Sequence, residues 1–296
     1  MTKILILGGG GMVGQKLANH LLASGLLGHK ALDITLFDMA FPLKQDGRLR
    51  CITGSLTDAQ NITMLARLRP DIVFHLASIV SGEAESNFDA GWQVNMFTMW
   101  HYLEALKALH IGSNGAYVPK IIFTSSIAVF GGPFPEQIDD TFLSVPQTSY
   151  GAQKASCELL LSDFSRKGFV DGISLRLPTI CVRPGKANLA ASSFFSGIIR
   201  EPLNGQKAIL PVDESVRHWH ASPRAAPPTA SRSDPEDPCS ARRQAQQRVI
   251  CRPRAPSTTG LSTRRDRHAP ETPSEKGCPA VRCCVHRPRE TAGAPR

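Results

Sequence analysis

The stretch KILILGGGGMVG, residues 3–14, decides the fold of this chain. A short apolar run at 3–7 meets an amphipathic pattern at 12–24, and between them Gly8, Gly11 and Gly14 are spaced G-x-x-G-x-x-G. Glycines at this spacing permit a tight turn, a close approach of a pyrophosphate to the backbone, and close packing of helix on strand. The stretch therefore predicts a strand, a dinucleotide-binding turn that includes Met12 and Val13, and a helix whose first N–H groups face the phosphates.

The same alternation of apolar runs and helical patterns continues along the chain. Further runs lie at 33–37, 49–52, 71–76, 120–125 and 172–177, and amphipathic stretches lie at 58–68, 87–110 and 149–167. Near-continuous apolar runs are typical of strands that are covered on both faces. Asp58 is a candidate N-cap, and Pro70 closes the helix that it begins. We therefore expect an α/β fold, a doubly wound parallel sheet of the Rossmann type.

The pattern changes after residue 178. We expect residues 1–178 to form an NAD-binding Rossmann domain, and residues 179–224, which contain the apolar piece SSFFSGIIREPL, to form part of a substrate-binding region. Residues 225–296 differ from both, because they contain no aromatic residue, 13 Arg against 1 Lys, 11 Pro and five of the eight Cys. Such a segment buries too little apolar surface to offset its chain entropy, so we expect it to be disordered.

Three interpretations of residues 225–296 compete. An excess of Arg, Pro, Ala, Ser and Thr is what GC-rich DNA gives when it is read out of frame, and we favour a frameshift near Arg224. A natural basic arm that binds nucleic acid is the second interpretation. A metal site of Cys278, Cys283, Cys284 and His286 is the third, although CPAVRCCVH lacks the paired spacing of a zinc site.

The charge, the hydropathy and the cysteine usage restrict the class of protein and its cellular compartment. Residues 1–224 carry 20 basic and 18 acidic side chains, so the basic balance belongs to the last 72 residues and indicates no nucleic-acid partner for the rest. No stretch approaches the roughly 18 apolar residues that a membrane span needs. Three scattered cysteines, Cys51, Cys157 and Cys181, fit reduced thiols, and we expect a cytoplasmic protein without a signal peptide.

Ser126, Tyr150 and Lys154 are the candidate catalytic residues. Tyr150 and Lys154 are one helical turn apart in TSYGAQK, so they share a helix face, and Ser126 ends the run IIFTSS. A tyrosine with a pKa near 10 becomes a useful base only if a nearby positive charge favours the phenolate. Lys154 can supply that charge, and Ser126 can bind the reacting oxygen. The set indicates a nicotinamide-dependent enzyme acting on a hydroxyl or carbonyl carbon.

Other polar residues are candidates for binding or structural roles. Asp38 lies 24 residues beyond Gly14 and can accept hydrogen bonds from ribose hydroxyls, which favours NAD over NADP. Asn95 either braces the active-site backbone or is an ordinary buried amide. His75 fits the core better than a ligand set. His218 and His220 stay open, and we favour a substrate-loop role for Arg217.

The motifs together resemble the extended short-chain dehydrogenase/reductase family, the group of the NAD-dependent epimerases and dehydratases. The resemblance rests on GGGGMVG, Asp38, DIVFHLAS, Asn95, TSSIAVFG, the Tyr150/Lys154 pair and LRLPTI, and covers about residues 1–185. It implies that Leu76 and Ala77 line the adenosine side of the cofactor, that Leu56 also contacts the cofactor, and that Pro178, Thr179 and Ile180 pack near the nicotinamide. Ser55 stands where many members carry an acid that meets the adenine, and VFG replaces VYG.

Four longer runs extend the likeness to about residues 1–224: SIVSGEAESNFDAGWQVN, CELLLSDFSRKGF, LRLPTICVRPGKAN and SSFFSGIIREPLNG. They resemble one branch of the family, the D-erythronate dehydrogenases. This resemblance implies oxidation of D-erythronate at C2, with NAD as hydride acceptor. A carboxylate substrate needs a cation or well-aimed donors. Arg183 and Arg217 are the candidate cations, and Ser81 and Ser192 are candidate hydroxyl donors, with Ser126 and Tyr150 at the reacting centre. The resemblance also implies homodimers that form through the helices at about 87–110 and 149–167.

Three alternatives remain at the level of sequence. A nucleotide-sugar epimerase would use the same residues and keep its NAD tightly bound. A non-catalytic NAD-binding regulator would not need intact Ser126, Tyr150 and Lys154. A chain whose substrate region is incomplete could bind NAD without turnover, and it would expose apolar surface from SFFSGII.

Overall fold

A computed structural model of the 296-residue chain describes residues 1–26, 31–135, 138–139, 142–185, 187–213, 218–225 and 248–249. Its main sheet contains the strands β1 (Thr2–Leu7), β2 (Leu32–Asp38), β3 (Leu49–Thr53), β4 (Ile72–His75), β5 (Lys120–Ser126), β6 (Asp171–Leu177) and β9 (Arg248–Val249). The strand order is β3-β2-β1-β4-β5-β6-β9, and every pair is parallel. The order of the first six strands is that of a doubly wound dinucleotide-binding fold, which confirms the predicted class.

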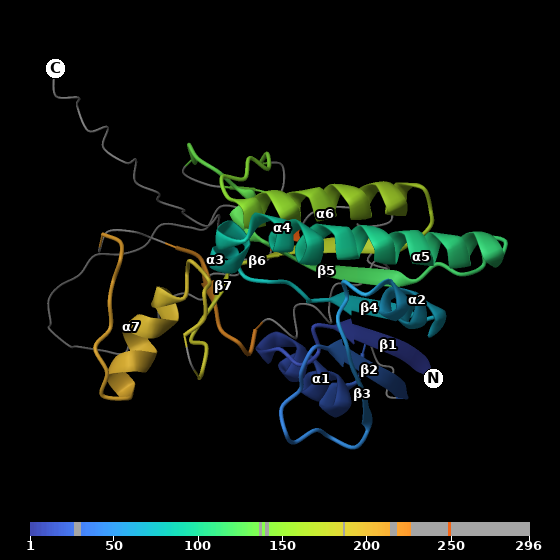
Figure 1. Cartoon of the computed structure of the whole chain (residues 1–296), viewed down its shortest axis with the longest axis horizontal. Coiled ribbons are helices and arrows are strands. Elements are labelled where there is room, and N and C mark those ends of the chain that lie inside the picture. Colours follow the sequence, from blue (N-terminus) through green and yellow to red (C-terminus); the bar gives the residue numbers. More distant parts are fainter. Residues whose placement is uncertain are drawn as a thin grey trace, which may run out of the picture.

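Helices cover both faces of this sheet (Figure 1). The helices α2 (Ala59–Arg67), α5 (Thr98–Gly112) and α6 (Ser149–Arg166) pack on one face, and α1 (Met12–Ser24) packs on the other. Leu5 and Leu7 of β1 point to the first group, whereas Ile4 and Ile6 join the cluster around α1. This alternation along one strand explains why the run at 3–7 is apolar at every position.

Two of the sequence expectations need correction. The stretch at 87–110 is not one uniform helix: it contains α4 (Phe88–Trp92), a π-helical turn η1 (Gln93–Phe97) and α5, and the short helix α3 (Ser81–Ser86) precedes it. The run at 49–52 forms β3, but β3 lies at the sheet edge and is largely exposed rather than covered on both faces. Asp58 caps α2 as predicted, because its Oδ1 accepts a 2.8 Å hydrogen bond from the Gln60 N–H.

The segment after β6 forms a small extension beside the carboxyl ends of the strands (Figure 1). It contains β7 (Thr179–Ile180), α7 (Phe194–Leu203) within the predicted apolar piece, and β8 (His220–Ala221), which pairs in parallel with β7. Beyond residue 225 the structure describes only β9, which pairs in parallel with β6, and the disorder expected for residues 225–296 stays a prediction. The other residues of that segment, the cysteine set included, lie outside the described residues.

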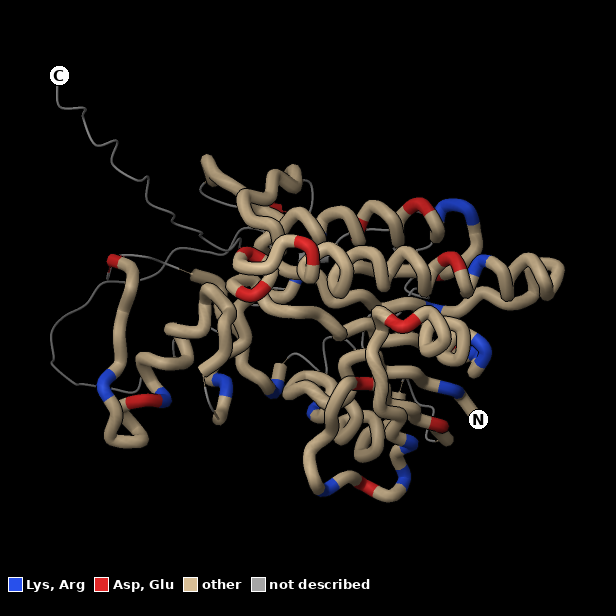
Figure 2. Tube along the Cα trace, viewed as in Figure 1, with Lys and Arg blue, Asp and Glu red and all other residues tan. Residues whose placement is uncertain are grey.

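Basic and acidic residues are interspersed over the described chain and do not gather on one element (Figure 2). Within the described residues no helix is both long enough and apolar enough to cross a bilayer.

Candidate active site

The glycine turn lies where the strand order reverses, between β1 and β4. Gly8 follows β1 with φ +84°, and a Cβ on it would lie 2.6 Å from the backbone nitrogen of Ala77, which follows β4. A Cβ on Gly14 would lie 2.3 Å from the carbonyl oxygen of Gly8, whereas one on Gly11 meets nothing closer than 3.4 Å. Gly8 therefore makes the turn and Gly14 the close helix packing, as predicted, and the space in front of Gly11 stays open for a ligand.

Gly10 is a further constrained position that the G-x-x-G-x-x-G spacing did not identify. A Cβ there would lie 1.9 Å from the carbonyl oxygen of Ala40, and its N–H donates a 2.9 Å hydrogen bond to Oδ2 of Asp38. The other carboxylate oxygen of Asp38 accepts from the Met39 N–H at 2.7 Å. These bonds hold the carboxylate at the end of β2, beside the glycine turn, and leave each oxygen capacity for a second donor.

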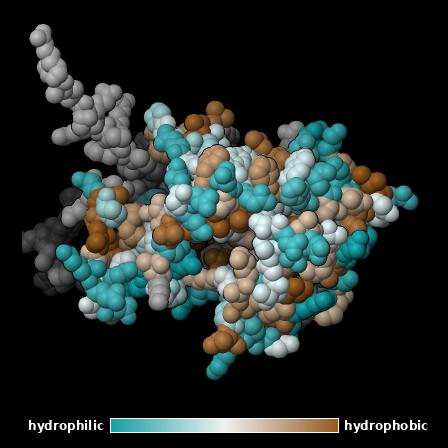
Figure 3. All heavy atoms as spheres, in the orientation of Figure 1, coloured by the Kyte–Doolittle hydropathy of each residue, from teal (hydrophilic) through white to brown (hydrophobic). Residues whose placement is uncertain are grey.

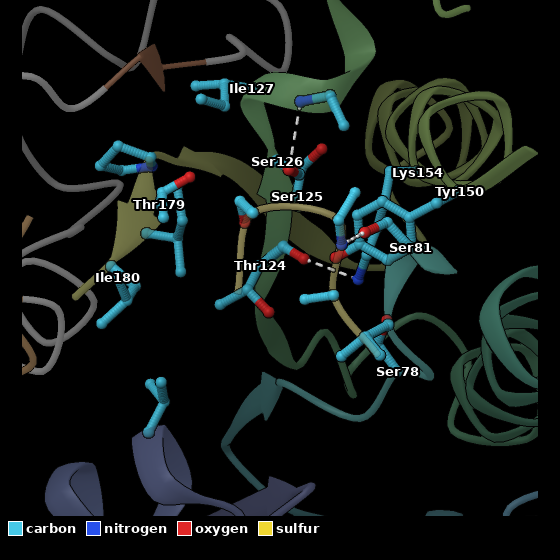
Figure 4. Close-up of a pocket in the computed structure, with 18 of the residues that line it drawn as sticks. Ser78, Ser81, Thr124, Ser125, Ser126, Ile127, Tyr150, Lys154, Thr179 and Ile180 are labelled. Atoms are coloured by element: carbon cyan, nitrogen blue, oxygen red, sulfur yellow. Dashed lines mark hydrogen bonds between the residues drawn. The ribbon is translucent and has the colours of Figure 1, made fainter. Parts of the chain in front are cut away.

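A cavity of about 590 Å³ begins at this turn and passes along the carboxyl ends of β4, β5 and β6 (Figure 4). Its volume lies within the range of about 300–1,000 Å³ that is usual for small-molecule and cofactor sites. In the space-filling view a hollow separates the body of the sheet from the α7 region (Figure 3). The predicted site residues that line it are Gly8, Gly11, Met12, Val13, Gly14, Leu76, Ser81, Ser126, Tyr150, Lys154, Pro178, Thr179, Ile180, Arg183 and Ser192.

The three candidate catalytic side chains come together in this cavity. Tyr150 and Lys154 extend from the first turns of α6, and Ser126 ends β5 (Figure 4). A Cβ on Gly151 would lie 2.2 Å from the carbonyl oxygen of Ala128, so this glycine lets α6 approach the 3₁₀ turn η2 (Ile127–Val129) that follows Ser126. The close contact brings the helix that carries Tyr150 against the end of the strand that carries Ser126.

Lys154 is almost fully buried, with 2% of its surface exposed. Its Nζ donates a 3.0 Å hydrogen bond to the carbonyl oxygen of Thr124 and lies 5.6 Å from the centre of the Tyr150 ring. Burial, with a contribution from the charge of Lys154, lowers the pKa of His75 to about 3, so this imidazole is neutral at pH 7. His75 is a core residue of β4, as the sequence favoured.

Asn95 lies behind the cavity wall and is buried. Its Oδ1 accepts from the Ile79 N–H at 2.9 Å, and its Nδ2 donates to Oε1 of Gln153 at 2.8 Å. The amide thus ties the segment after β4 to α6, which fits the bracing role among the two that the sequence left open. The widened turn of η1 presents it, and π-helical turns are frequent at functional sites.

The remaining predicted residues do not line the cavity. Leu56 is buried in the hydrophobic core with α2 and α5, Ala77 lies against Gly8, and Asp38 lies at the end of β2 beside the turn. Their cofactor contacts stay predictions. Arg217 lies outside the described residues.

The far end of the cavity is formed by the segment after β6. The Ser81 hydroxyl oxygen accepts from the Ala191 N–H at 2.9 Å, and the backbone of Arg183 is held on both sides, by the Ser196 hydroxyl and by Arg200. These contacts fix Arg183 at the cavity wall, where it is the one cationic lining side chain of the described residues besides Lys154.

The two histidines of RHWH have different surroundings. His218 lines the cavity, its Nε2 lies 2.7 Å from the Thr179 hydroxyl, and its ring stacks on Phe195. Burial and the neighbouring His220 lower the pKa of His218 to about 4. His220 Nδ1 lies 3.2 Å from Sγ of Cys181, away from the cavity lining. In the described ranges no group of three or more His, Cys, Asp or Glu side chains could hold a metal ion.

Sequence reasoning missed several lining residues, among them Ser125 and Trp219. Ser125 neighbours Ser126 in TSS, so a run of three hydroxyl residues at a strand end was the available signal. Trp219 reaches the cavity only because β8 pairs with β7 across almost 40 residues of chain, and no local pattern predicts that pairing.

Comparisons with known proteins agree with this geometry. The profile of the NAD dependent epimerase/dehydratase family matches residues 4–221. The chain is 46% identical over 223 residues to D-erythronate dehydrogenase of Haemophilus influenzae, covering 75% of this chain and 68% of the relative. It is 47% identical over 229 residues to D-erythronate dehydrogenase of Cupriavidus necator, covering 75% and 69%.

A solved structure described as a nucleoside-diphosphate-sugar epimerase from Agrobacterium tumefaciens superposes with a TM-score of 0.71. The two sequences are 51% identical, and the match covers 78% of this chain and 68% of that one. UDP-glucose 4-epimerase of Thermus thermophilus, solved with NAD, is 20% identical, covers 77% of this chain and 72% of its own, and has a TM-score of 0.65, so it shows the fold. The predicted NAD cofactor and oxidoreductase class are confirmed at the level of the family: the chain belongs to the NAD-dependent epimerase/dehydratase family.

Proposed function

We propose that this chain oxidises D-erythronate at C2 to 2-dehydro-D-erythronate. The observation that carries the proposal is that one cavity contains the glycine turn at one end, Ser126, Tyr150 and Lys154 in the middle, and the cation of Arg183 at the other. The two D-erythronate dehydrogenase relatives support the choice of substrate.

Bound NAD would supply a hydride acceptor for the C2 hydrogen. Tyr150 accepts the proton of the C2 hydroxyl, Ser126 hydrogen-bonds the same oxygen, and Lys154 stabilises the tyrosinate. The ammonium of Lys154 is buried beside the ring, in surroundings where charge interactions are stronger than in water.

The residues around the glycine turn fit NAD better than NADP. Gly8, Gly10 and Gly14 leave no room for a Cβ, Gly11 opens onto the cavity, and α1 begins there with no side-chain cap on its first N–H groups. Asp38 lies beside this turn, where its carboxylate accepts ribose hydroxyls and repels a 2′-phosphate. Its replacement by Asn should therefore weaken the preference for NAD over NADP.

Arg183 is the candidate partner of the substrate carboxylate. Two hydrogen bonds hold its backbone at the far cavity wall, and a planar guanidinium can bind a carboxylate through two parallel N–H donors. Arg183→Ala should raise KM for D-erythronate more than it lowers kcat. Arg217 remains a second candidate, and Ser81 and Ser192 remain candidate hydroxyl donors.

The direct test is NADH formation, followed at 340 nm, with the purified 296-residue chain, NAD and D-erythronate. A version that continues in the alternative reading frame after Arg224 is assayed beside it. Turnover by either chain that is lost in Tyr150→Phe supports the dehydrogenase. Binding of NAD without turnover by both chains would contradict the proposal.

A second candidate is nucleotide-sugar epimerisation, which the description of the similar Agrobacterium tumefaciens structure favours. An epimerase uses the same Tyr, Lys and Ser but returns the hydride to its sugar. Incubation with a UDP-sugar would then change the sugar without net NADH, whereas a dehydrogenase accumulates NADH in proportion to its acid substrate.

We also propose a homodimer that forms through α5 and α6. These helices lie side by side on the outer layer, and Phe97, Trp100 and Leu159 expose apolar surface there. Burial of such surface between two copies stabilises association. Light scattering coupled to size exclusion should give the dimer mass, and the double change Trp100→Glu/Leu159→Glu should give the monomer. A wild-type monomer would contradict the proposed dimer.

We further propose that the protein is cytoplasmic. Cys51, Cys157 and Cys181 are free thiols, which fit a reducing compartment.

A further inference from the structure

Two buried polar groups that line the active-site cavity have no hydrogen-bond partner among the described residues. One is the hydroxyl of Ser125, a residue 3% exposed at the end of β5. The other is the indole N–H of Trp219, a residue 8% exposed beside β8. Leaving a buried donor unpaired costs free energy, and native proteins rarely do so without a reason.

The neighbouring hydroxyls differ from Ser125 because each already makes one hydrogen bond within the protein. Thr124 Oγ1 donates to the His75 carbonyl oxygen, Ser126 Oγ accepts from the Ala128 N–H, and Thr148 Oγ1 accepts from the Gly151 N–H. Ser125 lies between Thr124 and Ser126 on the same strand and has no such partner (Figure 4). Its hydroxyl therefore keeps its donor and its acceptor capacity unused within the described residues.

Two contacts, one of its backbone and one of its ring, hold Trp219 in place while its indole N–H stays unpaired. Its carbonyl oxygen accepts from the Thr179 N–H at 3.1 Å, and its ring packs edge-on against Phe130, another lining residue, with centroids 6.2 Å apart. An indole N–H can only donate, so its partner must be an acceptor such as an oxygen atom. Trp92 also has a buried, unpaired N–H, but it lies outside the cavity lining.

We infer that Ser125 and Trp219 bind the hydroxyl groups of the substrate that do not react, and so select a polyhydroxy acid over a simple 2-hydroxy acid. This inference rests on the proposed function, in which Ser126 and Tyr150 take the C2 oxygen and Arg183 the carboxylate. Of the oxygen atoms of a four-carbon sugar acid, the hydroxyls on C3 and C4 then remain. A substrate hydroxyl oxygen can accept the hydrogen bond of the Trp219 indole N–H. A second substrate hydroxyl can either donate to the Ser125 hydroxyl or accept from it.

Kinetics of conservative variants test the inference. Trp219→Phe keeps the aromatic packing on Phe130 and removes the N–H, and Ser125→Ala removes only the hydroxyl. Each should lower kcat/KM for D-erythronate about tenfold or more, mainly through KM, because a site built for a hydroxyl loses its partner. With D-2-hydroxybutyrate, which lacks both hydroxyls, each variant should match the wild type.

Two controls separate this effect from damage to the fold. Trp92→Phe removes an unpaired buried indole N–H outside the cavity, and Ser174→Ala removes a buried strand hydroxyl from β6 outside the lining. Both should retain wild-type kinetics. Equal losses on D-erythronate and on D-2-hydroxybutyrate in the Trp219 and Ser125 variants would overturn the inference, since hydroxyl recognition predicts a loss on the first substrate alone.

A measurement without turnover distinguishes failure of the inference from failure of the proposed function. The chain has three Trp, and Trp219→Phe identifies the indole signal of Trp219 in a ¹H–¹⁵N spectrum. With NAD present, D-erythronate or D-threonate should shift this signal, whereas D-2-hydroxybutyrate should not. A shift without NADH formation would contradict only the proposed reaction. An unchanged Trp219 signal with either polyhydroxy acid at saturation would overturn the inference.

Discussion

The ammonium of Lys154 donates a 3.0 Å hydrogen bond to the carbonyl oxygen of Thr124. This bond joins α6 to the last residues of β5, directly before Ser125 and Ser126. It holds the ammonium beside the Tyr150 ring and ties α6 to the strand end on which Ser126 lies. In the proposed reaction Lys154 would therefore have both an electrostatic and a structural role.

Lys154→Met removes the charge and keeps most of the buried stem. We expect kcat to fall by about 10²-fold or more, since positioned acid–base groups contribute that much. The assay is NADH formation at saturating NAD and D-erythronate, with Lys107→Met on α5 as the control. An unchanged kcat would remove Lys154 from the proton-transfer step.

Gly14→Ala tests the close packing of α1. The new Cβ would lie 2.3 Å from the Gly8 carbonyl oxygen, so the glycine turn must shift to admit it. We expect NAD affinity, measured by calorimetry, to fall at least about tenfold, which corresponds to 1.4 kcal/mol. Gly112→Ala is the matched control, because a Cβ there meets nothing within 4 Å. Equal NAD affinity in both variants would contradict the proposed cofactor site.

The largest loss in free energy of unfolding is predicted for breaking the ion pair between Arg176 of β6 and Glu158 of α6. Both side chains are 0% exposed, and Nη2 of Arg176 lies 2.8 Å from Oε2 of Glu158. Removing one partner of such a buried pair typically costs about 3–5 kcal/mol. We expect urea unfolding to show a loss of that order for Glu158→Gln. Asp163→Asn breaks the exposed pair with Arg166 and should cost at most about 1 kcal/mol.

The lowered pKa of the buried His75 predicts how the free energy of unfolding depends on pH. Burial lowers its pKa to about 3 in the folded chain, below its ordinary value of 6.5. The unfolded chain therefore binds a proton below pH 6.5 that the folded chain does not, so stability falls as the pH falls from 6.5 toward 3.

His75→Leu should remove this contribution. At pH 5 the difference of 1.5 pH units from the unfolded pKa amounts to about 2 kcal/mol. Urea unfolding at pH 7 and pH 5 should thus show a smaller loss for His75→Leu than for the wild type or for His101→Gln, which changes an exposed histidine. Parallel losses in all three proteins would show that the pH dependence arises elsewhere.

Local sequence patterns predicted those parts of the molecule that depend on neighbours in the chain. Five of the six apolar runs form β1, β2, β4, β5 and β6, because a strand covered on both faces must be apolar at nearly every position, and the sixth forms the edge strand β3. Asp58 caps α2, and Gly8 takes the left-handed conformation that its turn needs. The Tyr150/Lys154 pair shares a face of α6 because four residues make about one helical turn.

Local sequence patterns did not predict the features of a helix or strand that depend on which other part of the chain it contacts. The exposure of β3 follows from its place at the sheet edge, and the bracing contacts of Asn95 depend on Ile79 and Gln153. Neither partner is recognisable from the local sequence, since both lie more than ten residues away.

The sequence by itself determined the parallel sheet, the glycine turn and the residues that can move a proton, because strand periodicity, turn geometry and helix spacing act over a few residues. Only the tertiary structure decided which polar groups stay unpaired around the cavity. Ser125 and Trp219 lie far apart in the sequence. What sets apart the Ser125 hydroxyl and the Trp219 indole N–H is that neither has a hydrogen-bond partner among the described residues. Whether a buried group has a partner depends on the packing of the whole domain, and no local pattern encodes it.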